Sequence, residues 1–279
     1  MKRFLFLVLL LGVLAVGSLE AFAPHLSPLA PEADMPPRAE DAPAGSFRKL
    51  TRPDLETPTR GPFVYQPSAR SAAAAAERSA LNRTALRRWR FYAPAGGTGP
   101  MPLVILFHGA GRTGLSMIDM WLDVADRHGL ALVAPDAPLG GWPFKAPDAA
   151  FARKLVERAG RETAIDRSRV FLFGHSNGGV YAHILTNRTS GPWRAAATHG
   201  GFAPPQFLQA PAEAKPFRMY LGTAEHICPP DAAEAVGRAM AKAGHAVDLV
   251  IIPYHTHWFY DAGPKIAEDA WRWFEGIGG

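Results

Sequence analysis

The chain has a single cysteine, Cys228, among its 279 residues. One thiol cannot form an intramolecular disulfide, so the folded chain must be held together by its core. A hydrophobic content of 48% is ample for one large core. The composition therefore predicts one globular domain in which Cys228 is a packed or idle thiol.

Long hydrophobic runs are also missing. The apolar run near the N-terminus, residues 4–16, is shorter than the ~20 residues that span a bilayer. It follows Lys2 and Arg3 and precedes small residues up to Ala23, which is typical of a secretory signal peptide. We expect residues 1–23 to be a signal peptide, with the cleavage site left open by Pro24. This predicts a secreted or periplasmic protein that contacts a membrane only if the leader stays uncleaved.

Aromatic side chains are scarce among the basic residues. The net charge is +5, the isoelectric point is about 9.5, and arginines concentrate in residues 70–90 and in the leader. Nucleic-acid-binding surfaces combine clustered cations with stacking aromatics or with a recognisable motif. We interpret residues 70–90 as a solvated basic segment and expect no nucleic-acid partner.

Regular hydrophobic periodicity is missing from residues 24–62, which are rich in proline, alanine and charge. This composition is typical of a linker that cannot bury enough apolar surface to fold. We expect a disordered linker over residues 24–67 and one folded domain over residues 68–279. A chain beginning near Ser68 is then expected to fold and to keep full activity.

After Leu86, apolar runs alternate with amphipathic stretches. This alternation predicts βαβ units, and therefore an α/β fold with a mainly parallel sheet flanked by helices. In such sheets, ligands bind beyond the carboxyl ends of the strands. The expected strands are residues 87–92, 103–107, 130–134, 170–173, 195–198, 218–221 and 247–252, and the expected helices are residues 115–128, 149–159, 179–187, 231–243 and 265–274.

The pentapeptide 174–178, Gly-His-Ser-Asn-Gly, lies between an expected strand and an expected helix. A serine on a sharp strand-to-helix turn is a nucleophile elbow, in which the backbone at the serine is strained. Its neighbours must be small so that strand and helix can approach each other. Gly174 and Gly178 meet this requirement, so Ser176 is the candidate nucleophile.

A serine hydroxyl is a poor nucleophile and needs a base that is oriented by an acid. In chains with this elbow, the acid and then the histidine follow the serine. His255 and His257 follow the last expected strand. We favour His257 as the base, because it lies far enough past the strand for the loop to turn inward, and His255 is the alternative. The two could also form a His-x-His metal site, but no third or fourth ligand is evident, and we expect no metal.

The acid should follow the preceding strand, 218–221, and Glu225 does so. Asp231 is the rival. It follows two prolines and has the character of a helix N-cap, which is a common structural role for aspartate. We therefore favour Glu225 as the acid.

An oxyanion that forms during acyl transfer needs preorganised backbone donors. One is the amide of Asn177, directly after the nucleophile. The other should come from the glycine-flanked turn after strand 103–107, where we assign Ala110, with Gly111 as the alternative. His108, at the start of this turn, is expected to brace the loop.

With these residues in place, the chain resembles the α/β-hydrolase superfamily. Within it, the chain is similar to the secreted poly(3-hydroxybutyrate) depolymerase and feruloyl esterase-like group. It departs from that group in having Glu225 in place of aspartate, in lacking cysteine pairs, and in the form of its histidine loop. The similarity covers about residue 87 to the C-terminus and rests on residues 102–109, 165–170, 174–179 and 221–225 and on the terminal histidine loop.

The catalytic residues and the resemblance together imply an exported serine hydrolase that cleaves carboxylic esters without a cofactor. Only residues 200–216 separate the strand that ends at His199 from the next, so any lid is minimal. An open cleft suits small-molecule, aryl or polymer-attached esters, with Trp142, Phe202 and Trp258 as candidate substrate-binding walls.

Two other functions fit parts of this pattern. A prolyl-oligopeptidase-like peptidase would share the fold, but such enzymes normally carry a gating domain, which the sequence lacks. A non-catalytic envelope binding protein could use the same scaffold, because fold does not fix function. The set of serine, histidine, acid and glycines favours the hydrolase.

Overall fold

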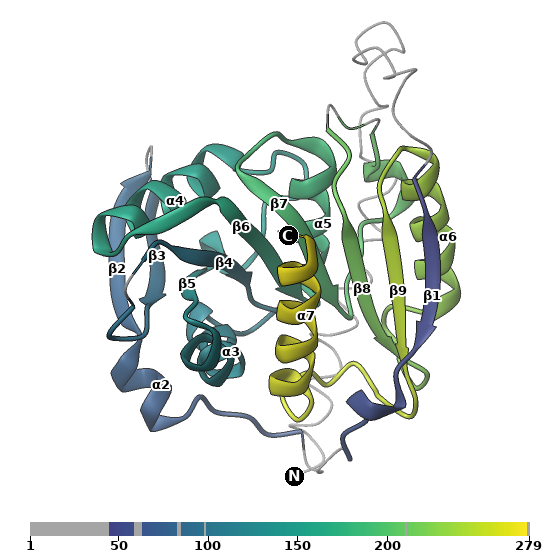
Figure 1. Cartoon of the computed structure of the whole chain (residues 1–279). Helices are drawn as coiled ribbons and strands as arrows, with labels where there is room; N and C mark the ends of the chain where they lie inside the picture. The colour runs from purple at the N-terminus through teal and green to yellow at the C-terminus, as the bar shows by residue number, and fades with distance from the viewer. Residues whose placement is uncertain are drawn as a thin grey trace, which may run out of the picture. The chain divides into compact units, whose positions relative to one another are not determined.

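A computed structural model describes residues 45–58, 63–82, 85–97, 99–209, 211 and 213–277. These residues form a nine-stranded sheet in the order β1-β9-β8-β7-β6-β4-β5-β3-β2 (Figure 1). The first seven strands of this order, from β1 at one edge to β5, run parallel to one another. At the far edge, β3 pairs antiparallel with β5, and β2 pairs antiparallel with β3. The strands are β1 (Phe47–Thr51), β2 (Ala76–Asn82), β3 (Ala85–Tyr92), β4 (Met101–Phe107), β5 (Ala131–Pro135), β6 (Ile165–His175), β7 (Trp193–His199), β8 (Phe217–Gly222) and β9 (Val247–Ile252).

Helices cover both faces of the sheet (Figure 1). Side chains of α3 and α7 form the core on one face, and side chains of α4, α5 and α6 form the core on the other. A short helix, α2, packs beside α3. The helices are α2 (Ala69–Ala74), α3 (Gly114–His128), α4 (Ala149–Glu162), α5 (Asn177–Arg188), α6 (Pro230–Lys242) and α7 (Gly263–Ile277).

Strand β4 shows why the sequence forms a buried central strand. All seven of its residues are buried, as expected for a parallel strand covered on both faces. Because side chains alternate along a strand, Leu103 and Ile105 enter the core beside α4 and α5, whereas Val104 and Leu106 enter the core beside α3 and α7. The central strands therefore join the two cores and hold their carboxyl ends in a fixed row.

The α/β fold predicted from the sequence is confirmed. The seven expected strands correspond to β3 to β9, and the five expected helices correspond to α3 to α7. Strand β6 begins at Ile165, five residues before the expected start, because Ile165 pairs with Met101 of β4.

The sequence-based linker is wrong for residues 47–55. Strand β1 pairs in parallel with β9, with Phe47 opposite Val247, and a 3-10 turn over Pro53–Leu55 follows. Leu55 is buried in the core beside α7. Residues 24–44 and 59–62 of the expected linker lie outside the described residues. The folded domain therefore includes residues well before Ser68.

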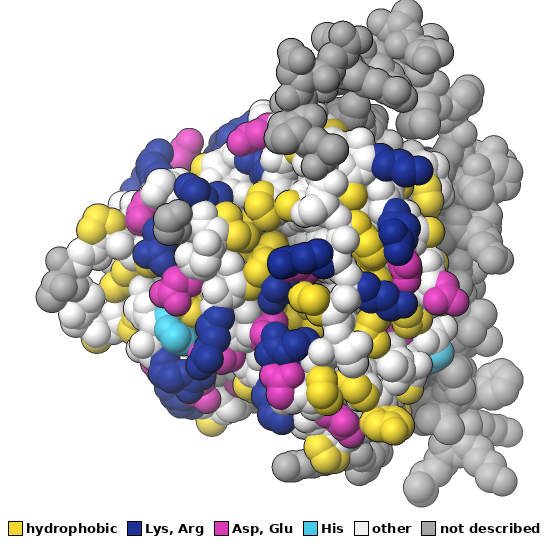
Figure 2. Space-filling view, turned by 45° about the vertical axis from the view of Figure 1, so that its right-hand side comes forward, with side chains coloured by type: hydrophobic (Ala, Val, Ile, Leu, Met, Phe, Trp, Pro, Cys, Tyr) yellow, Lys and Arg dark blue, Asp and Glu magenta, His cyan; other side chains and the backbone are white. Residues whose placement is uncertain are grey.

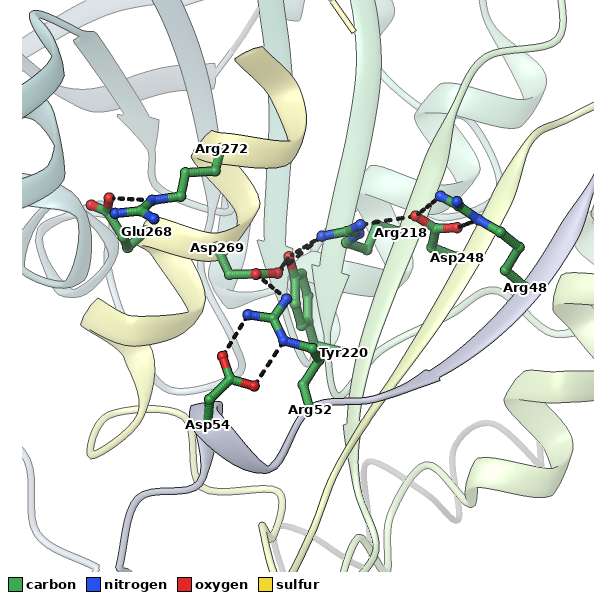
Figure 3. Close-up of polar contacts among 9 residues, drawn as sticks. All are labelled: Arg48, Arg52, Asp54, Arg218, Tyr220, Asp248, Glu268, Asp269 and Arg272. Atoms are coloured by element: carbon green, nitrogen blue, oxygen red, sulfur yellow. Dashed lines mark hydrogen bonds and ion pairs between the residues drawn. The ribbon is translucent and has the colours of Figure 1, made fainter. Parts of the chain in front are cut away.

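Ion pairs explain why periodicity did not reveal β1 (Figure 3). Arg48 donates to both carboxylate oxygens of Asp248 on β9, with nitrogen–oxygen distances of 2.7 and 2.9 Å. Arg52 binds Asp269 on α7. Arg218 on β8 lies between the two carboxylates, 2.9 Å from Asp248 and 3.0 Å from Asp269. The segment is held by charges that are about 200 residues away in the sequence, which a hydrophobic pattern cannot show.

Residues 63–68 are also packed against the domain. The Tyr65 hydroxyl donates to Asp119 Oδ2 on α3 at 2.6 Å, and the Ser68 hydroxyl donates to Asp119 Oδ1 at 2.6 Å. The Tyr65 ring stacks on Tyr260, with centroids 4.0 Å apart. This part of the expected linker therefore lies close to the loop that follows β9.

The basic segment 70–90 is not simply solvated. Arg70 pairs with two aspartates of α3, and Arg78 pairs with Glu162 at 2.8 Å. Arg87 is buried, where its guanidinium lies 3.9 Å from the Phe151 ring centroid and pairs with Asp148. Figure 2 shows basic and acidic side chains lying next to each other on one face of the molecule. The positive charge is dispersed because many cations pair with carboxylates from distant parts of the chain.

Within the ranges that the structure describes, no helix combines the length and the apolar character needed to cross a bilayer. The expected signal peptide, residues 1–23, lies outside those ranges and stays a prediction.

Candidate active site

The turn between β6 and α5 places Ser176 at the carboxyl edge of the sheet. Ser176 has φ 52° and ψ −120°, so its backbone is strained. Its amide donates to the His199 carbonyl at 2.8 Å. A Cβ on Gly174 would lie 2.2 Å from the Gly178 carbonyl oxygen, and a Cβ on Gly178 would lie 2.2 Å from the Phe107 carbonyl oxygen. Both glycines are therefore needed for the strand and the helix to approach each other.

The loop after β9 brings His257 to the serine. His257 Nε2 lies 2.9 Å from Ser176 Oγ. The imidazole packs against Gly200, which has φ +56° and follows β7. A Cβ on Gly200 would lie 3.0 Å from both Cε1 and Nδ1 of His257, so the glycine leaves room for the ring. Sequence reasoning did not single out Gly200, because nothing in the local pattern marks what it faces.

The loop after β8 brings Glu225 to the other side of His257. Glu225 Oε2 lies 2.7 Å from His257 Nδ1, and Glu225 Oε1 accepts from the amides of Ile227 at 2.7 Å and Cys228 at 3.2 Å. Burial disfavours the carboxylate, but the hydrogen bond and electrostatic attraction from His257 and the hydrogen bonds from the two amides outweigh it. They hold the pKa of Glu225 below its usual range, so the group is ionised at neutral pH.

Asp231 lies outside this arrangement. It is exposed in the first turn of α6, and Pro229 is the N-cap. The expectation that Asp231 caps the helix is therefore wrong by two positions. Its place in the first turn still suits the helix dipole.

Cys228 supports the acid loop through its backbone. Burial, with a further contribution from Glu225, raises the pKa of the Cys228 thiol to about 12. The thiol is therefore protonated, and its packing against the core beside α6 agrees with the expected packed thiol.

His255 is buried behind the site and does not reach Ser176. Its Nε2 atom lies 2.7 Å from His199 Nε2. Its carbonyl accepts from the Ala224 amide at 3.0 Å, which ties the histidine loop to the acid loop. Gly222 allows this close approach, since a Cβ there would lie 1.7 Å from the His255 carbonyl oxygen.

The turn after β4 lies against the nucleophile. A Cβ on Gly109 would lie 3.3 Å from Ser176 Cβ. His108 braces the turn, because its Nε2 accepts from the Ala137 amide at 2.9 Å and its Nδ1 lies 2.8 Å from the Gly109 carbonyl. Burial lowers the pKa of His108, so the ring is neutral and its Nδ1–H donates to Gly109. The turn that carries Ala110 therefore approaches the serine at Gly109.

The amide of Asn177 is the second expected oxyanion donor. Asn177 is the first residue of α5, and amides in the first turn of a helix have no acceptor within the helix. The positive end of the helix dipole adds to this donor. Ala110 and Asn177 thus lie on the two segments that adjoin Ser176.

The three expected substrate-binding aromatics occupy different environments. Trp142 is buried, stacks on Tyr181 with centroids 4.9 Å apart, and donates to the His108 carbonyl at 2.9 Å. It supports the turn after β4 from the core, so the structure does not show it as a cleft wall. Phe202 is half-buried against the core, and Trp258 is half-buried directly after His257.

Sequence reasoning missed a cluster that joins Trp258 to the turn after β4. The Arg112 guanidinium lies 5.0 Å from the Tyr260 ring centroid, 5.3 Å from that of Tyr65 and 5.8 Å from that of Trp258. Arg112 also donates to the Tyr65 carbonyl at 3.1 Å. The exposed ring of Phe63 lies against Trp258, with centroids 5.3 Å apart. No sequence signal places Phe63 or Tyr65 here, because both come from the expected linker.

In the part of the chain that the structure describes, no three histidine, cysteine, aspartate or glutamate side chains are grouped so as to hold a metal ion.

Residues 147–274 match the dienelactone hydrolase family. No curated protein matches the chain significantly. Among solved structures, esterase 2 of Thermogutta terrifontis phosphorylated by paraoxon is 19% identical, with a TM-score of 0.61 over 74% of this chain and 95% of that chain. An S-formylglutathione hydrolase from Agrobacterium tumefaciens is 16% identical, with a TM-score of 0.59 over 73% of this chain and 95% of that chain.

At these identities the structural similarities establish the fold. They agree with the mostly parallel sheet flanked by helices described above. The narrower resemblance to poly(3-hydroxybutyrate) depolymerases stays a prediction. The chain therefore has the α/β-hydrolase fold, and the segment that matches the dienelactone hydrolase family contains Ser176, Glu225 and His257.

Proposed function

We propose that this protein is a serine hydrolase that cleaves carboxylic esters through an acyl-enzyme, with Ser176 as nucleophile, His257 as base and Glu225 as orienting acid. One observation carries the proposal, namely the continuous hydrogen-bonded line from Ser176 Oγ through both nitrogens of His257 to Glu225 Oε2. The family match and the esterases of similar fold support ester hydrolysis.

The line of hydrogen bonds fixes the direction of proton transfer. Glu225 is ionised and accepts the Nδ1–H of His257, which leaves the Nε2 lone pair to accept the proton of Ser176. As Ser176 Oγ adds to the ester carbonyl, its proton moves to His257 Nε2 and an oxyanion forms. The amides of Asn177 and Ala110 would donate to this oxyanion.

The tetrahedral intermediate then collapses to the acyl-serine. The bond from carbon to the alcohol oxygen breaks, and His257 gives its proton to that oxygen, so the alcohol leaves neutral. In the second half, His257 takes a proton from water as the water adds to the acyl carbon. Collapse releases the carboxylic acid and returns the proton to Ser176 Oγ.

The surroundings of the triad favour esters with an aromatic or extended apolar part. Tyr254 exposes its aromatic ring on the loop of His257, and Phe63 exposes its ring beside the half-buried Trp258. Ile227 exposes an aliphatic side chain on the loop of Glu225. In the described residues between β7 and β8, the only helical element is the 3-10 turn Pro205–Phe207. An aryl ester or a polymer-attached ester fits this open, apolar surrounding, and we also propose that the enzyme is exported.

The decisive experiment labels the purified protein with a fluorophosphonate and maps the modified peptide by mass spectrometry. A phosphonyl adduct on Ser176, absent from Ser176→Ala, supports the proposal. A folded protein without any adduct would favour a non-catalytic binding protein. Assays with aryl esters of varied acyl length, a feruloyl ester, a hydroxybutyrate oligomer and a prolyl peptide then separate an esterase from a peptidase.

A further inference from the structure

Three histidines outside the proposed triad form a line beneath it. His175 ends β6, His199 ends β7, and His255 follows β9. The Nδ1 atoms of His175 and His199 are 3.0 Å apart, and the Nε2 atoms of His199 and His255 are 2.7 Å apart. The register of the sheet sets His175 opposite His199, so the first contact is built into the pairing of β6 with β7.

All three rings are buried, with exposed fractions of 6% for His175, 0% for His199 and 2% for His255. Burial lowers the pKa of His255 to about 4 and holds the pKa values of His175 and His199 well below their usual range. Each ring is therefore neutral at pH 7 and carries one N–H and one lone pair. Only two arrangements of three neutral rings satisfy both contacts, and they point in opposite directions.

The charges at the two ends of the line differ. Burial has the largest effect on the pKa of His255 and lowers it, and His257 lowers it further. The carboxylates of Glu225 and Asp261 act in the opposite direction and raise the pKa of His255. At the other end, burial and the neighbouring histidines His257 and His255 lower the pKa of His175, and the Arg112 guanidinium lowers it further. Carboxylates favour a proton on the outer nitrogen of the last ring, and the Arg112 guanidinium favours a lone pair on the outer nitrogen of the first.

The outer nitrogen of His175 lies at the proposed active site. A Cβ on Gly109 would lie 3.4 Å from His175 Nε2 and 3.3 Å from Ser176 Cβ, so both atoms border the same glycine of the turn after β4. The ring centroids of His175 and His257 are 5.4 Å apart. A partial charge on His175 Nε2 is therefore close to the ring that becomes an imidazolium.

We propose that His175, His199 and His255 form a polarised hydrogen-bond chain whose lone-pair end, His175 Nε2, stabilises the positive charge that His257 acquires during ester hydrolysis. In this chain, His175 Nδ1–H donates to His199 Nδ1, and His199 Nε2–H donates to His255 Nε2. The dipoles of the rings add along the line.

The catalytic part of this inference rests on the proposed function, whereas the direction of the chain does not. His199 and His255 are positioning residues, since they act on His257 through His175 and through the loop backbone.

The direction of the chain is tested first in the resting protein by ¹⁵N NMR of the histidine rings at pH 7. We expect Nδ1–H on His175, Nε2–H on His199 and Nδ1–H on His255. The opposite set of tautomers, or an imidazolium at any of the three positions, overturns the proposal. This result does not depend on any ester being hydrolysed, so it is distinct from a failure of the proposed function.

Kinetics test the effect on His257. His199→Phe fills the same space but breaks both contacts, and we expect kcat to fall about tenfold with KM nearly unchanged. Because His175 loses the partner that keeps its lone pair on Nε2, the imidazolium of His257 is less stabilised, and the acid limb of the pH profile of kcat/KM should move to lower pH. His199→Gln, whose amide accepts from one neighbour and donates to the other, should restore much of kcat.

His245→Phe is the matched control. His245 is also buried, but it bonds the backbone of Lys215 and lies away from the histidine line. We expect it to change stability without changing kcat or the pH profile. A folded His199→Phe protein with the wild-type kcat and pH profile would overturn the electrostatic role, as would an acid limb that moves to higher pH.

Discussion

The edge of the sheet at β1 and the row of strand ends around Ser176 are held together by different interactions. Around Ser176, close backbone approaches at glycines and short hydrogen bonds fix each side chain. At β1, a five-residue strand with mixed burial is held by long-range ion pairs among arginines and buried carboxylates (Figure 3). The residues around Ser176 lie in short motifs directly after strands, which the sequence reveals. Strand β1 depends on ion-pair partners about 200 residues away, which the sequence does not reveal.

The largest effect is expected at the base. His257→Ala should lower kcat on the order of 10⁴-fold, because neither proton transfer can then proceed. His255→Ala should cost far less, since His255 does not reach Ser176. Steady-state kinetics of both variants with one aryl ester measure the difference. If His255→Ala were the more damaging change in a folded protein, the assignment of the base would be wrong.

The second-largest effect on kcat is expected at the acid, Glu225. Glu225→Gln should lower kcat on the order of 10³- to 10⁴-fold with little change in KM, because His257 loses the partner that fixes its tautomer. Asp231→Asn is the matched control and should be silent, since Asp231 is exposed in the first turn of α6. A silent Glu225→Gln beside a crippled Asp231→Asn would reverse the assignment.

At β1, the region held by ion pairs, we expect truncation to reduce the stability of the fold. A chain beginning at Ser68 lacks β1 and leaves Asp248 and Asp269 without Arg48 and Arg52, which should lower the free energy of unfolding by about 3 kcal/mol or more. This reverses the expectation drawn from the sequence. Thermal denaturation compares it with a chain beginning at Gly45, and equal melting temperatures would show that β1 contributes nothing.

The same comparison has a pH dependence. Burial raises the pKa of Asp248, but Arg48 and Arg218 outweigh it and hold the pKa below its usual range. The resulting stability is fully present above the unfolded pKa of about 4 and is lost as pH falls through the folded value. The difference in free energy of unfolding between the chain beginning at Gly45 and the chain beginning at Ser68 should therefore become smaller below about pH 4.

The smallest effect is expected at Gly200. In Gly200→Ala, the new Cβ would lie 3.0 Å from His257, and a tilted ring should lower kcat about tenfold. Gly129→Ala is the matched control, because Gly129 also has a positive φ but has open space around its Cβ position. Both variants carry the same kind of backbone strain, so equal kcat values would show that the contact with His257 has no effect.

The fold could be predicted from β3 onward because buried strands such as β4 are continuous apolar runs and the helices are amphipathic. Ser176, Glu225 and His257 could be placed together because each follows a strand whose carboxyl end reaches the same edge. Gly200 and Arg112 could not be found this way. Their roles depend on what lies opposite them in space, which no single segment shows.

The predicted start of the folded domain, Ser68, was wrong for a related reason. Phe47 and Leu50 are the only large apolar residues of β1, and they are too few to show a period. Tyr65 packs on Tyr260 and Asp119, neither of which is near it in the sequence. Proline- and charge-rich sequence indicates a linker only when no distant partner holds it.

Trapping the acyl-enzyme is the most direct test of the proposed mechanism. The protein would be mixed with an aryl ester, quenched with acid within the first turnover, digested and examined by mass spectrometry. If Ser176 is the nucleophile, a burst of released aryl alcohol appears together with the acyl mass on the peptide that carries Ser176, and neither appears in Ser176→Ala. Ester hydrolysis that persists in Ser176→Ala, or an acyl mass on any other residue, would contradict it.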